Sequence, residues 1–223
     1  MAVDPDPGVP IASGRAAEVF DLGDGTVLRR YRRDHDVERE ARLMRWLAGS
    51  GVRVPIVHGA DGRDLVMERI DGPTMLEDLQ RRPWMITRHG RLLATLQDRL
   101  AALSAPDWVR HDPRVPDGSS VLHLDLHPMN VMLAADGPVV IDWTNAGRGD
   151  PWFDAAVTVA IMSSFEVHHP RDSIARRLLV GTFARRRGRR ELTTRLGQAC
   201  EFRMQDPGVT PYERRQLERL SSR

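Results

Sequence analysis

The sequence has 223 residues, of which 41% are hydrophobic, 29% are charged and 5% are aromatic. This composition excludes a disulfide-rich mini-protein, a collagen and a fully disordered chain, and the length allows one large or two small domains. The formal net charge is only +2, and all 33 basic residues are arginines. The single cysteine, Cys200, cannot form an intramolecular disulfide, which favours a reducing compartment.

The ends of the chain bear on its location and partners. The N-terminus lacks the basic and apolar regions of a signal peptide, and no apolar run approaches the roughly 20 residues of a membrane span. We therefore expect a cytoplasmic protein without membrane contact. Residues 1–170 carry a net charge of −6 and residues 171–223 a net charge of +8. No aromatic residues interleave with the arginines of 184–190, so a solvated helical face is favoured over a nucleic-acid partner.

The first third of the chain predicts a small sheet with one helix. Residues 18–21 and 26–31 are β-prone and flank a Gly-Asp-Gly turn, which is typical of a hairpin. Apolar residues at helical spacing predict a helix over 34–48. Two further strands are predicted over 54–58 and 64–69.

The rest of the chain predicts mainly helices. A long helix is expected from about residue 84 to 103, followed by a Pro/Asp/Gly loop over 105–120. Three short apolar segments then read as strands, and helices follow from residue 151, with breaks near Pro170, Gly188 and Pro207. We therefore expect an α+β fold of two lobes, an N-terminal lobe over 1–70 and a helical C-terminal lobe over 71–223.

The chemically informative segment is His-Leu-Asp-Leu-His-Pro-Met-Asn at 123–130, followed by Val-Val-Ile-Asp-Trp at 139–143. Each polar residue alone has a structural interpretation: Asp125 as a turn cap, Asn130 in a left-handed position and Asp142 as a strand end. Together, the Asp-x4-Asn spacing and the second aspartate match the catalytic-loop spacing of protein kinases, in which Asp is the base and Asn binds Mg²⁺. Asn130 and Asp142 are hard oxygen ligands suited to Mg²⁺.

These motifs resemble those of the aminoglycoside phosphotransferase and choline kinase-like family, the small-molecule relatives of protein kinases. The family typically has His-Gly-Asp-Leu-His-x-x-Asn and Ile-Asp-Trp, so Leu124 departs from the pattern and Trp143 follows it. The resemblance implies a bilobal protein-kinase-like fold, with Asp125 as catalytic base and Asn130 and Asp142 as ligands of Mg²⁺. It also implies that His123 supports the loop, that His127 faces it, and that Asp150 bonds the loop backbone.

The resemblance further assigns nucleotide-binding residues in the first lobe. Arg29 stands where the family has its ATP-binding lysine, with Glu40 as its partner acid and Glu38 as the alternative. Ser13 and Gly14 begin the expected phosphate-covering loop, which reads equally well as an ordinary turn. Residues 67–72 resemble the hinge that binds adenine, where Met67, Glu68 and Ile70 would contact the base; an edge strand leading into a linker is the alternative.

The resemblance implies an ATP- and Mg²⁺-dependent phosphotransferase that acts on a hydroxyl of a small molecule, aminoglycoside-like or another hydroxylated metabolite. A net charge of +8 over 171–223 makes a polycationic aminoglycoside less attractive. A second interpretation keeps the fold and makes the chain a small atypical protein kinase of the RIO or Bud32 kind. A third is a pseudokinase-type nucleotide-binding interaction module, which the missing lysine and the glycine-poor loop favour.

Overall fold

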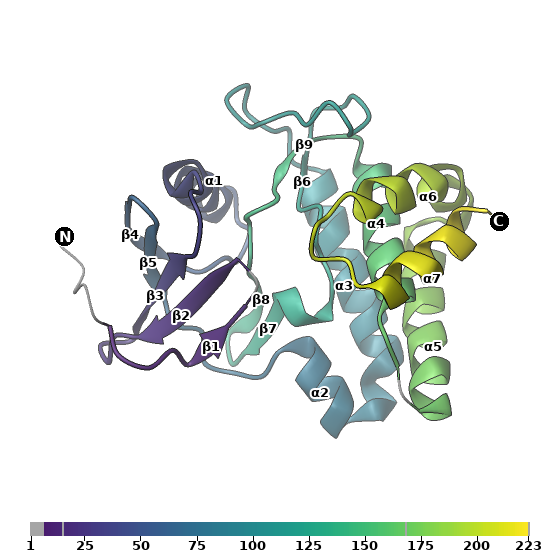
Figure 1. Cartoon of the computed structure of the whole chain (residues 1–223), viewed down its shortest axis with the longest axis horizontal. Coiled ribbons are helices and arrows are strands. Elements are labelled where there is room, and N and C mark those ends of the chain that lie inside the picture. Colours follow the sequence, from purple (N-terminus) through teal and green to yellow (C-terminus); the bar gives the residue numbers. More distant parts are fainter. Residues whose placement is uncertain (1–6, 15, 168, 223) are drawn as a thin grey trace. The chain divides into compact units, whose positions relative to one another are not determined.

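The computed structural model describes residues 7–14, 16–167 and 169–222, which form two compact units. Unit 1 comprises residues up to Gly72 together with Met132–Thr144, and unit 2 comprises Pro73–Val131 and Asn145 onward. Figure 1 labels their elements. Within the described part of the chain, no helix is both long and apolar enough to cross a membrane.

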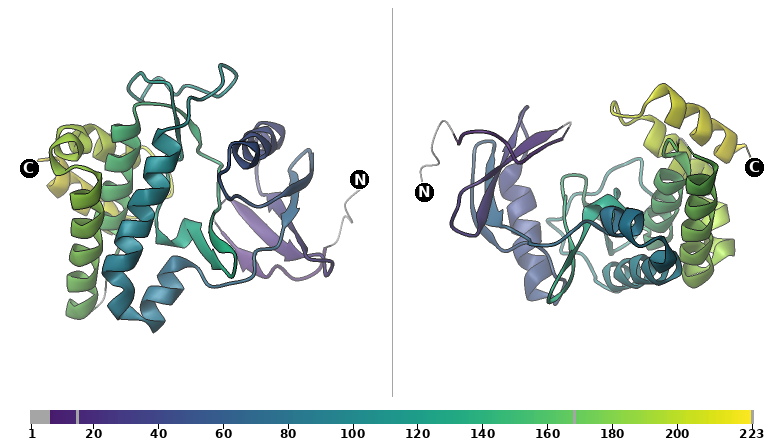
Figure 2. Two further views of the ribbon diagram at one scale, coloured as in Figure 1. Left: turned by 180° about the vertical axis from the view of Figure 1, so that it is seen from behind. Right: turned by 90° about the horizontal axis from the view of Figure 1, so that it is seen from below.

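Unit 1 is built on an antiparallel sheet with the strand order β1-β2-β3-β5-β4. The strands are β1 (Ala12–Ser13), β2 (Ala17–Asp21), β3 (Thr26–Tyr31), β4 (Val57–Asp61) and β5 (Asp64–Glu68). Phe20, Leu28 and Val66 form a buried cluster on the sheet. Helix α1 (Val37–Gly49) contacts β4 and β5, as Figure 2 shows, and buries an apolar stripe that includes Leu47.

The hairpin of β7 (Val131–Ala134) and β8 (Gly137–Val140) belongs to unit 1 from Met132 onward. The Val140 amide donates to the Arg53 carbonyl at 3.0 Å, and the Arg53 guanidinium pairs with Asp136 at 3.2 Å. Gly72 passes so close that a Cβ there would lie 2.4 Å from the Leu133 carbonyl oxygen. The sequence placed residues 132–144 in the C-terminal lobe, whereas these contacts join them to unit 1.

Unit 2 is mainly helical. Its helices are α2 (Met75–Arg81), η1 (Pro83–Met85), α3 (Ile86–Ala101), η2 (Pro128–Asn130), α4 (Pro151–Ser164), α5 (Pro170–Arg187), α6 (Arg189–Met204) and α7 (Pro211–Ser221). Its short strands β6 (Ser120–Leu122) and β9 (Gly147–Gly149) pair with each other. Helix α4 is apolar nearly all round because α3, α5, α6 and α7 all contact it. Cys200 is fully buried beside Ala160 and Leu217.

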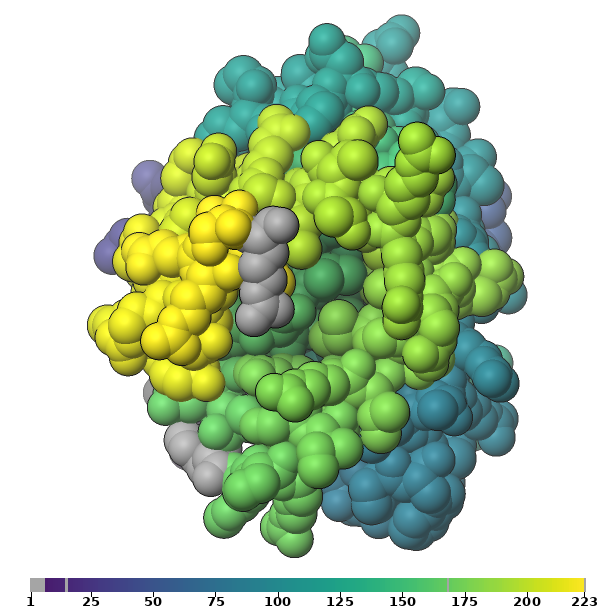
Figure 3. Space-filling model, turned by 90° about the vertical axis from the view of Figure 1, so that its right-hand side faces the viewer, coloured from purple at the N-terminus to yellow at the C-terminus, as the bar shows by residue number. Residues whose placement is uncertain are grey.

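The basic C-terminal segment forms the helices α5 to α7, which cover the face of unit 2 seen in Figure 3. Of its densest run, Arg185, Arg186, Arg189 and Arg190 are exposed. Arg187 is instead buried, with its guanidinium over the Trp152 ring and paired with Asp98. The segment is thus helical, and most arginines of this run are exposed.

Most sequence-predicted elements form, with shifted ends. The helix expected from 34 starts at Val37 because the Asp36 side chain caps it, accepting from the Arg39 amide at 3.0 Å. The strand expected over 54–58 starts only at Val57. The long helix starts at Ile86 rather than 84, after the 3₁₀ turn η1. Helix α2 and strand β9 were not predicted.

Candidate active site

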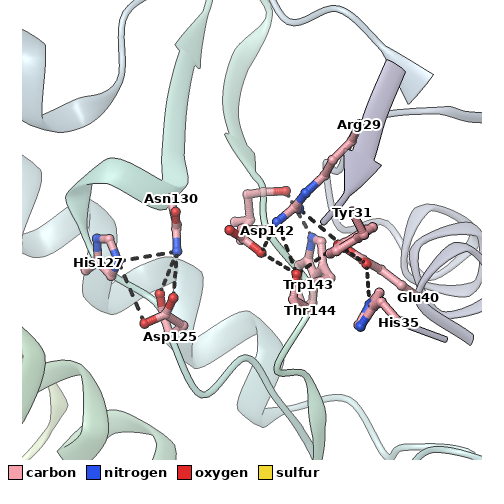
Figure 4. A network of polar contacts seen from close by, with 11 residues as sticks. Arg29, Tyr31, His35, Glu40, Asp125, His127, Asn130, Asp142, Trp143 and Thr144 are labelled. Atoms are coloured by element: carbon pink, nitrogen blue, oxygen red, sulfur yellow. Dashed lines mark hydrogen bonds and ion pairs between the residues drawn. The ribbon is translucent and has the colours of Figure 1, made fainter. Parts of the chain in front are cut away.

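Three of the predicted residues meet in unit 1 around Arg29, on the right-hand side of Figure 4. Arg29 lies on β3 and is only 8% exposed. One terminal nitrogen lies 2.8 Å from Asp142 Oδ1, and the other lies 3.5 Å from Glu40 Oε1. Glu40 is buried on α1, whereas the alternative, Glu38, is exposed. The structure therefore pairs Arg29 with Glu40, and it adds Asp142 to the pair.

Three residues that the sequence analysis missed complete this cluster. The Tyr31 hydroxyl donates to Glu40 Oε2 at 2.5 Å and lies 2.9 Å from Thr144 Oγ1. His35 Nε2 lies 2.9 Å from the same Glu40 oxygen, and its ring stacks on Tyr31 with centroids 4.2 Å apart. The sequence could have indicated Tyr31, because it stands two residues after Arg29 and therefore lies on the same face of β3.

The electrostatics of the cluster keep Arg29 charged. Burial acts to lower the pKa of the Arg29 guanidinium, but the negative charge of Asp142 raises it above its ordinary value, with a further contribution from Glu40. Burial, and then the charge of Glu40, raise the pKa of Tyr31, so its phenol stays neutral and can donate. The cluster thus presents one fixed cation held by two carboxylates.

Asp142 has an unusual backbone. Its φ is +64°, and Leu124 at +62° is the other non-glycine residue with positive φ among those described. The neighbouring Trp143 is 1% exposed, and its indole nitrogen donates to the Val140 carbonyl at 3.1 Å. The Thr144 hydroxyl donates to Asp142 Oδ1 at 2.7 Å. These contacts hold the Asp142 carboxylate in place, and 35% of its side chain remains exposed.

The predicted catalytic loop lies in unit 2, on the left-hand side of Figure 4. Asn130 Nδ2 donates to the Asp125 main-chain carbonyl at 2.9 Å and approaches Asp125 Oδ2 at 3.4 Å. His127 Nε2 lies 3.8 Å from Asp125 Oδ1. Arg203 of α6 was not predicted, and its terminal nitrogen lies 3.4 Å from the same oxygen. The loop therefore brings the Asp125, His127 and Asn130 side chains together.

Asn130 in unit 2 and Asp142 in unit 1 each offer an oxygen of the kind that Mg²⁺ prefers. Because Asn130 binds back through its nitrogen, its amide oxygen is left for a ligand, and the described residues give that oxygen no hydrogen-bond donor. Asp142 adds a partly exposed carboxylate. No group of three or more His, Cys, Asp or Glu residues in the described ranges could hold a metal by itself. Mg²⁺ commonly binds through one or two protein oxygens plus phosphates and water.

The acid that bonds the loop backbone is Asp154 rather than Asp150. Asp154 is 1% exposed and accepts from the His123 amide at 3.0 Å and the Leu124 amide at 2.7 Å. Asp150 instead caps α4 by accepting from the Trp152 amide, and it pairs with Arg195 at 2.6 Å. The sequence assignment of Asp150 is corrected because α4 starts at residue 151, which places Asp150 at its cap and Asp154 on its first turn.

The predicted hinge residues lie at the end of β5. The Glu68 carboxylate is held by both terminal nitrogens of Arg53 at 2.6 and 2.7 Å, and these bonds lower its pKa. The amides of Glu68 and Arg69 already donate to the carbonyls of Ile56 and Gly25. Outside the strand ladders, the described residues provide no partner for the Glu68 carbonyl or the Ile70 amide. Met67 and Ile70 are both half-buried.

The predicted phosphate loop is only partly described, because its Arg15 lies outside the described residues. The Gly14 amide donates to the Ala17 carbonyl at 2.9 Å, which closes a tight turn before β2. The Ser13 hydroxyl accepts from Arg32 at 2.7 Å. Ser13 therefore ends the edge strand β1, and Gly14 begins the turn that follows it.

Comparison with known proteins places the chain in a family. The model of the APH family, described as the phosphotransferase enzyme family, matches residues 8–115 and 97–192. The chain belongs to this family. No curated protein sequence matches the chain.

The structural comparison gives the same fold. A choline/ethanolamine kinase family protein from Mesorhizobium loti matches with a TM-score of 0.62 at 17% identity, over 94% of this chain and 85% of that one. The gentamicin complex of APH(2'')-IIa matches with a TM-score of 0.65 at 15% identity, over 96% and 88%. A microcompartment-associated aminopropanol kinase matches with a TM-score of 0.58 at 18% identity, over 96% and 88%. The family match makes the chain a phosphotransferase, and the structural matches show the protein-kinase-like α+β fold.

Proposed function

We propose that the protein transfers the γ-phosphoryl group of ATP to a hydroxyl of a small molecule in a Mg²⁺-dependent reaction. The observation that carries the proposal is the Asp125–Asn130 arrangement, in which the amide nitrogen binds the Asp125 carbonyl and the amide oxygen is left for a ligand. A structural neighbour, APH(2'')-IIa, is known in a ternary complex with streptomycin and ATP, which supports ATP as the donor. The aminopropanol kinase supports a small hydroxylated acceptor.

The main predicted site residues then have distinct chemical roles. The Asp125 carboxylate orients the acceptor hydroxyl and takes its proton as the oxygen attacks the γ-phosphorus and the bond to the β-phosphate oxygen breaks. Arg29 pairs with phosphate oxygens and is oriented by Glu40. Asn130 and Asp142 would hold Mg²⁺, which supplies charge neutralisation on the phosphates when bound. The Glu68 carbonyl and the Ile70 amide bind the adenine edge.

The arginine at position 29 is compatible with this role. A guanidinium carries the same charge as the usual lysine, but it presents several donors in a planar fork. Here that fork binds Asp142 and Thr144 through one terminal nitrogen and Glu40 through the other. A bound nucleotide competes for this cation with Asp142, so the Arg29–Asp142 pair loosens as the phosphates enter.

Asp125→Asn tests the proposal without knowledge of the acceptor, because water can take the place of the acceptor hydroxyl in a slow hydrolysis of ATP. We expect ATP hydrolysis to fall about 100-fold or more, the usual contribution of a general base, while the Kd for an ATP analogue stays within about threefold. Asp117→Asn is the matched control, since Asp117 is fully exposed in the loop that precedes β6. Unchanged hydrolysis in Asp125→Asn would contradict the proposal. If the wild type hydrolyses no ATP and both proteins bind the analogue equally, a nucleotide-binding module would be favoured.

A further inference from the structure

Unit 2 contains a cavity of about 660 Å³ beside the catalytic loop. Its described lining comes from α2, η1, the start of α3, η2 with the residue before it, the end of α4 with the residues that follow it, and α5. This size lies within the range of 300–1,000 Å³ that is usual for small-molecule sites. All of these lining residues belong to unit 2, so the cavity is a feature of that unit alone.

The cavity reaches the proposed catalytic base through one side chain. His127 lines it, and His127 Nε2 lies 3.8 Å from Asp125 Oδ1. The Phe165 and His127 rings pack in a T-shaped arrangement, with centroids 5.6 Å apart. Met129, also in the lining, is 45% exposed on the catalytic loop. A molecule in this cavity would therefore have one end against His127, the side chain that separates the cavity from Asp125.

The lining is mostly apolar and carries no net charge. Eleven of its seventeen described residues are apolar, and its four charged residues are two acids and two arginines. Arg171 pairs with Asp172 at 3.7 Å, and Arg176 donates to the Phe165 carbonyl at 2.6 Å. Of the two acids in the described lining, Asp172 has an ion pair with a lining arginine and Glu166 has none. A polycation finds little here that offsets the loss of its hydration.

We infer that this cavity binds the body of the phosphate acceptor, and that the acceptor is a neutral, largely apolar alcohol rather than a polycation. The inference rests on the proposed function, because it takes Asp125 as the base. The apolar walls of α2, α4 and α5 hold an alicyclic or aromatic skeleton, and its hydroxyl extends past His127 to Asp125. Burial of apolar surface supplies the affinity, and the hydroxyl supplies the orientation.

The direct test is calorimetric binding of 2-(2-naphthyl)ethanol, a neutral aromatic alcohol, to the full chain loaded with Mg²⁺ and adenylyl imidodiphosphate. We expect saturable binding with a Kd of about 1 mM or below, a value typical of a ligand of this size. With ATP, the same alcohol should raise the rate of ADP release at least fivefold, whereas gentamicin should not raise it. No binding of the alcohol, together with stimulation by gentamicin, would overturn the inference.

Two pairs of variants locate the binding in the cavity. Leu79→Glu places a charge in the lining on α2, and Ala175→Phe fills the cavity from α5; each should weaken binding of the alcohol at least tenfold. Leu178→Glu and Ile174→Phe are the matched controls, because both residues are exposed on α5 outside the lining, at 48% and 59%. Thermal melting establishes that each variant is folded. Equal binding by the lining variants and their controls would overturn the inference.

The nucleotide titration separates this inference from the proposed function. If adenylyl imidodiphosphate binds normally and the alcohol does not, only the acceptor assignment fails. If the nucleotide itself does not bind, the proposed function fails, and the assignment of the cavity to an acceptor is overturned with it. Normal nucleotide binding in Leu79→Glu and Ala175→Phe, with binding of the alcohol lost, is the combination that supports both.

Discussion

The Asp154 carboxylate accepts the main-chain amide of Leu124 at 2.7 Å, from a side chain that is 1% exposed. The His123 amide and the Gln97 side chain donate to its other oxygen. Three donors therefore converge on one buried carboxylate in the first turn of α4. This bond network fixes the backbone just before Asp125, so the position of the proposed base depends on a residue that does not touch the reaction.

Asp154→Asn should lower the free energy of unfolding by about 2–3 kcal/mol, because one amide oxygen cannot serve all three donors and a buried donor is left unpaired. Asp150→Asn is the matched control on the same helix. It leaves the capping oxygen and loses only a partly exposed ion pair, so its cost should stay near 1 kcal/mol. Urea unfolding of both variants gives the comparison. Equal losses of unfolding free energy in the two variants would contradict a special role for Asp154 in holding the loop backbone.

At position 124, replacement by glycine should destabilise the protein less than replacement by alanine, which reverses the usual order. The φ of Leu124, +62°, disfavours any residue with a Cβ by about 1–2 kcal/mol. Leu124→Gly and Leu124→Ala both lose the buried side chain, but only glycine relieves the backbone, so the glycine variant should be about 1 kcal/mol more stable than the alanine variant. At the buried Leu126, which lacks a positive φ, alanine should be the more stable. The same order at both positions would contradict the strained conformation.

Arg29 and Arg30 are neighbours on β3, and we expect only Arg29 to contribute to nucleotide binding. Arg29→Met leaves Glu40 and Asp142 without their cation, so we expect a loss of about 3 kcal/mol in stability and at least tenfold weaker binding of an ATP analogue. Arg30 pairs with Asp64, and Arg30→Met should leave nucleotide affinity within about twofold. Calorimetry and urea unfolding measure both quantities. Similar affinities for the two variants would remove Arg29 from the nucleotide site.

The pH dependence of stability should include a contribution from Asp112. Its hydrogen bonds with the Arg114 side chain, whose nitrogens lie 2.5 and 2.9 Å away, lower the pKa of Asp112 from 3.8 to about 2. The folded pKa lies below the unfolded value, so the stabilisation is complete above about pH 4 and is lost as the pH falls towards 2.

Asp112→Asn should therefore cost about 1–2 kcal/mol at pH 6, and this cost should shrink as the pH falls from 4 to 2. Urea unfolding at several pH values measures it. Asp117→Asn, in the same loop, loses only the pair of a fully exposed carboxylate with His111 at 3.4 Å, so its cost should stay small at every pH. A cost for Asp112→Asn that does not change with pH would contradict the assigned ion pair.

The sequence predicted the fold class and the motif residues because both depend on local patterns. The β2–β3 hairpin, α4 and the His-Leu-Asp-Leu-His-Pro-Met-Asn loop are each readable over a few residues. The interaction partners of those residues are harder to predict, because they depend on packing between segments that lie far apart in the sequence. Glu40 was found as the partner of Arg29 only through the resemblance, and Asp142 reaches Arg29 across 113 residues.

Two misses have clear physical reasons. Tyr31 and His35 act on Glu40 through a hydroxyl and a ring nitrogen, and neither belongs to a recognisable motif. Asp150 was preferred over Asp154 because both are acids beside the same turn. Only the start of α4 at residue 151 shows that the first one caps the helix and the second points at the loop.

The most direct test of the central claim is calorimetric titration with adenylyl imidodiphosphate, with and without Mg²⁺, on the wild type and Asp142→Asn. The proposed site predicts micromolar binding that strengthens at least tenfold with Mg²⁺ in the wild type, and a loss of that metal dependence in Asp142→Asn. Wild-type binding that is equal with and without Mg²⁺, or no binding under either condition, would contradict the assignment of Arg29, Asn130 and Asp142 to a magnesium–nucleotide site.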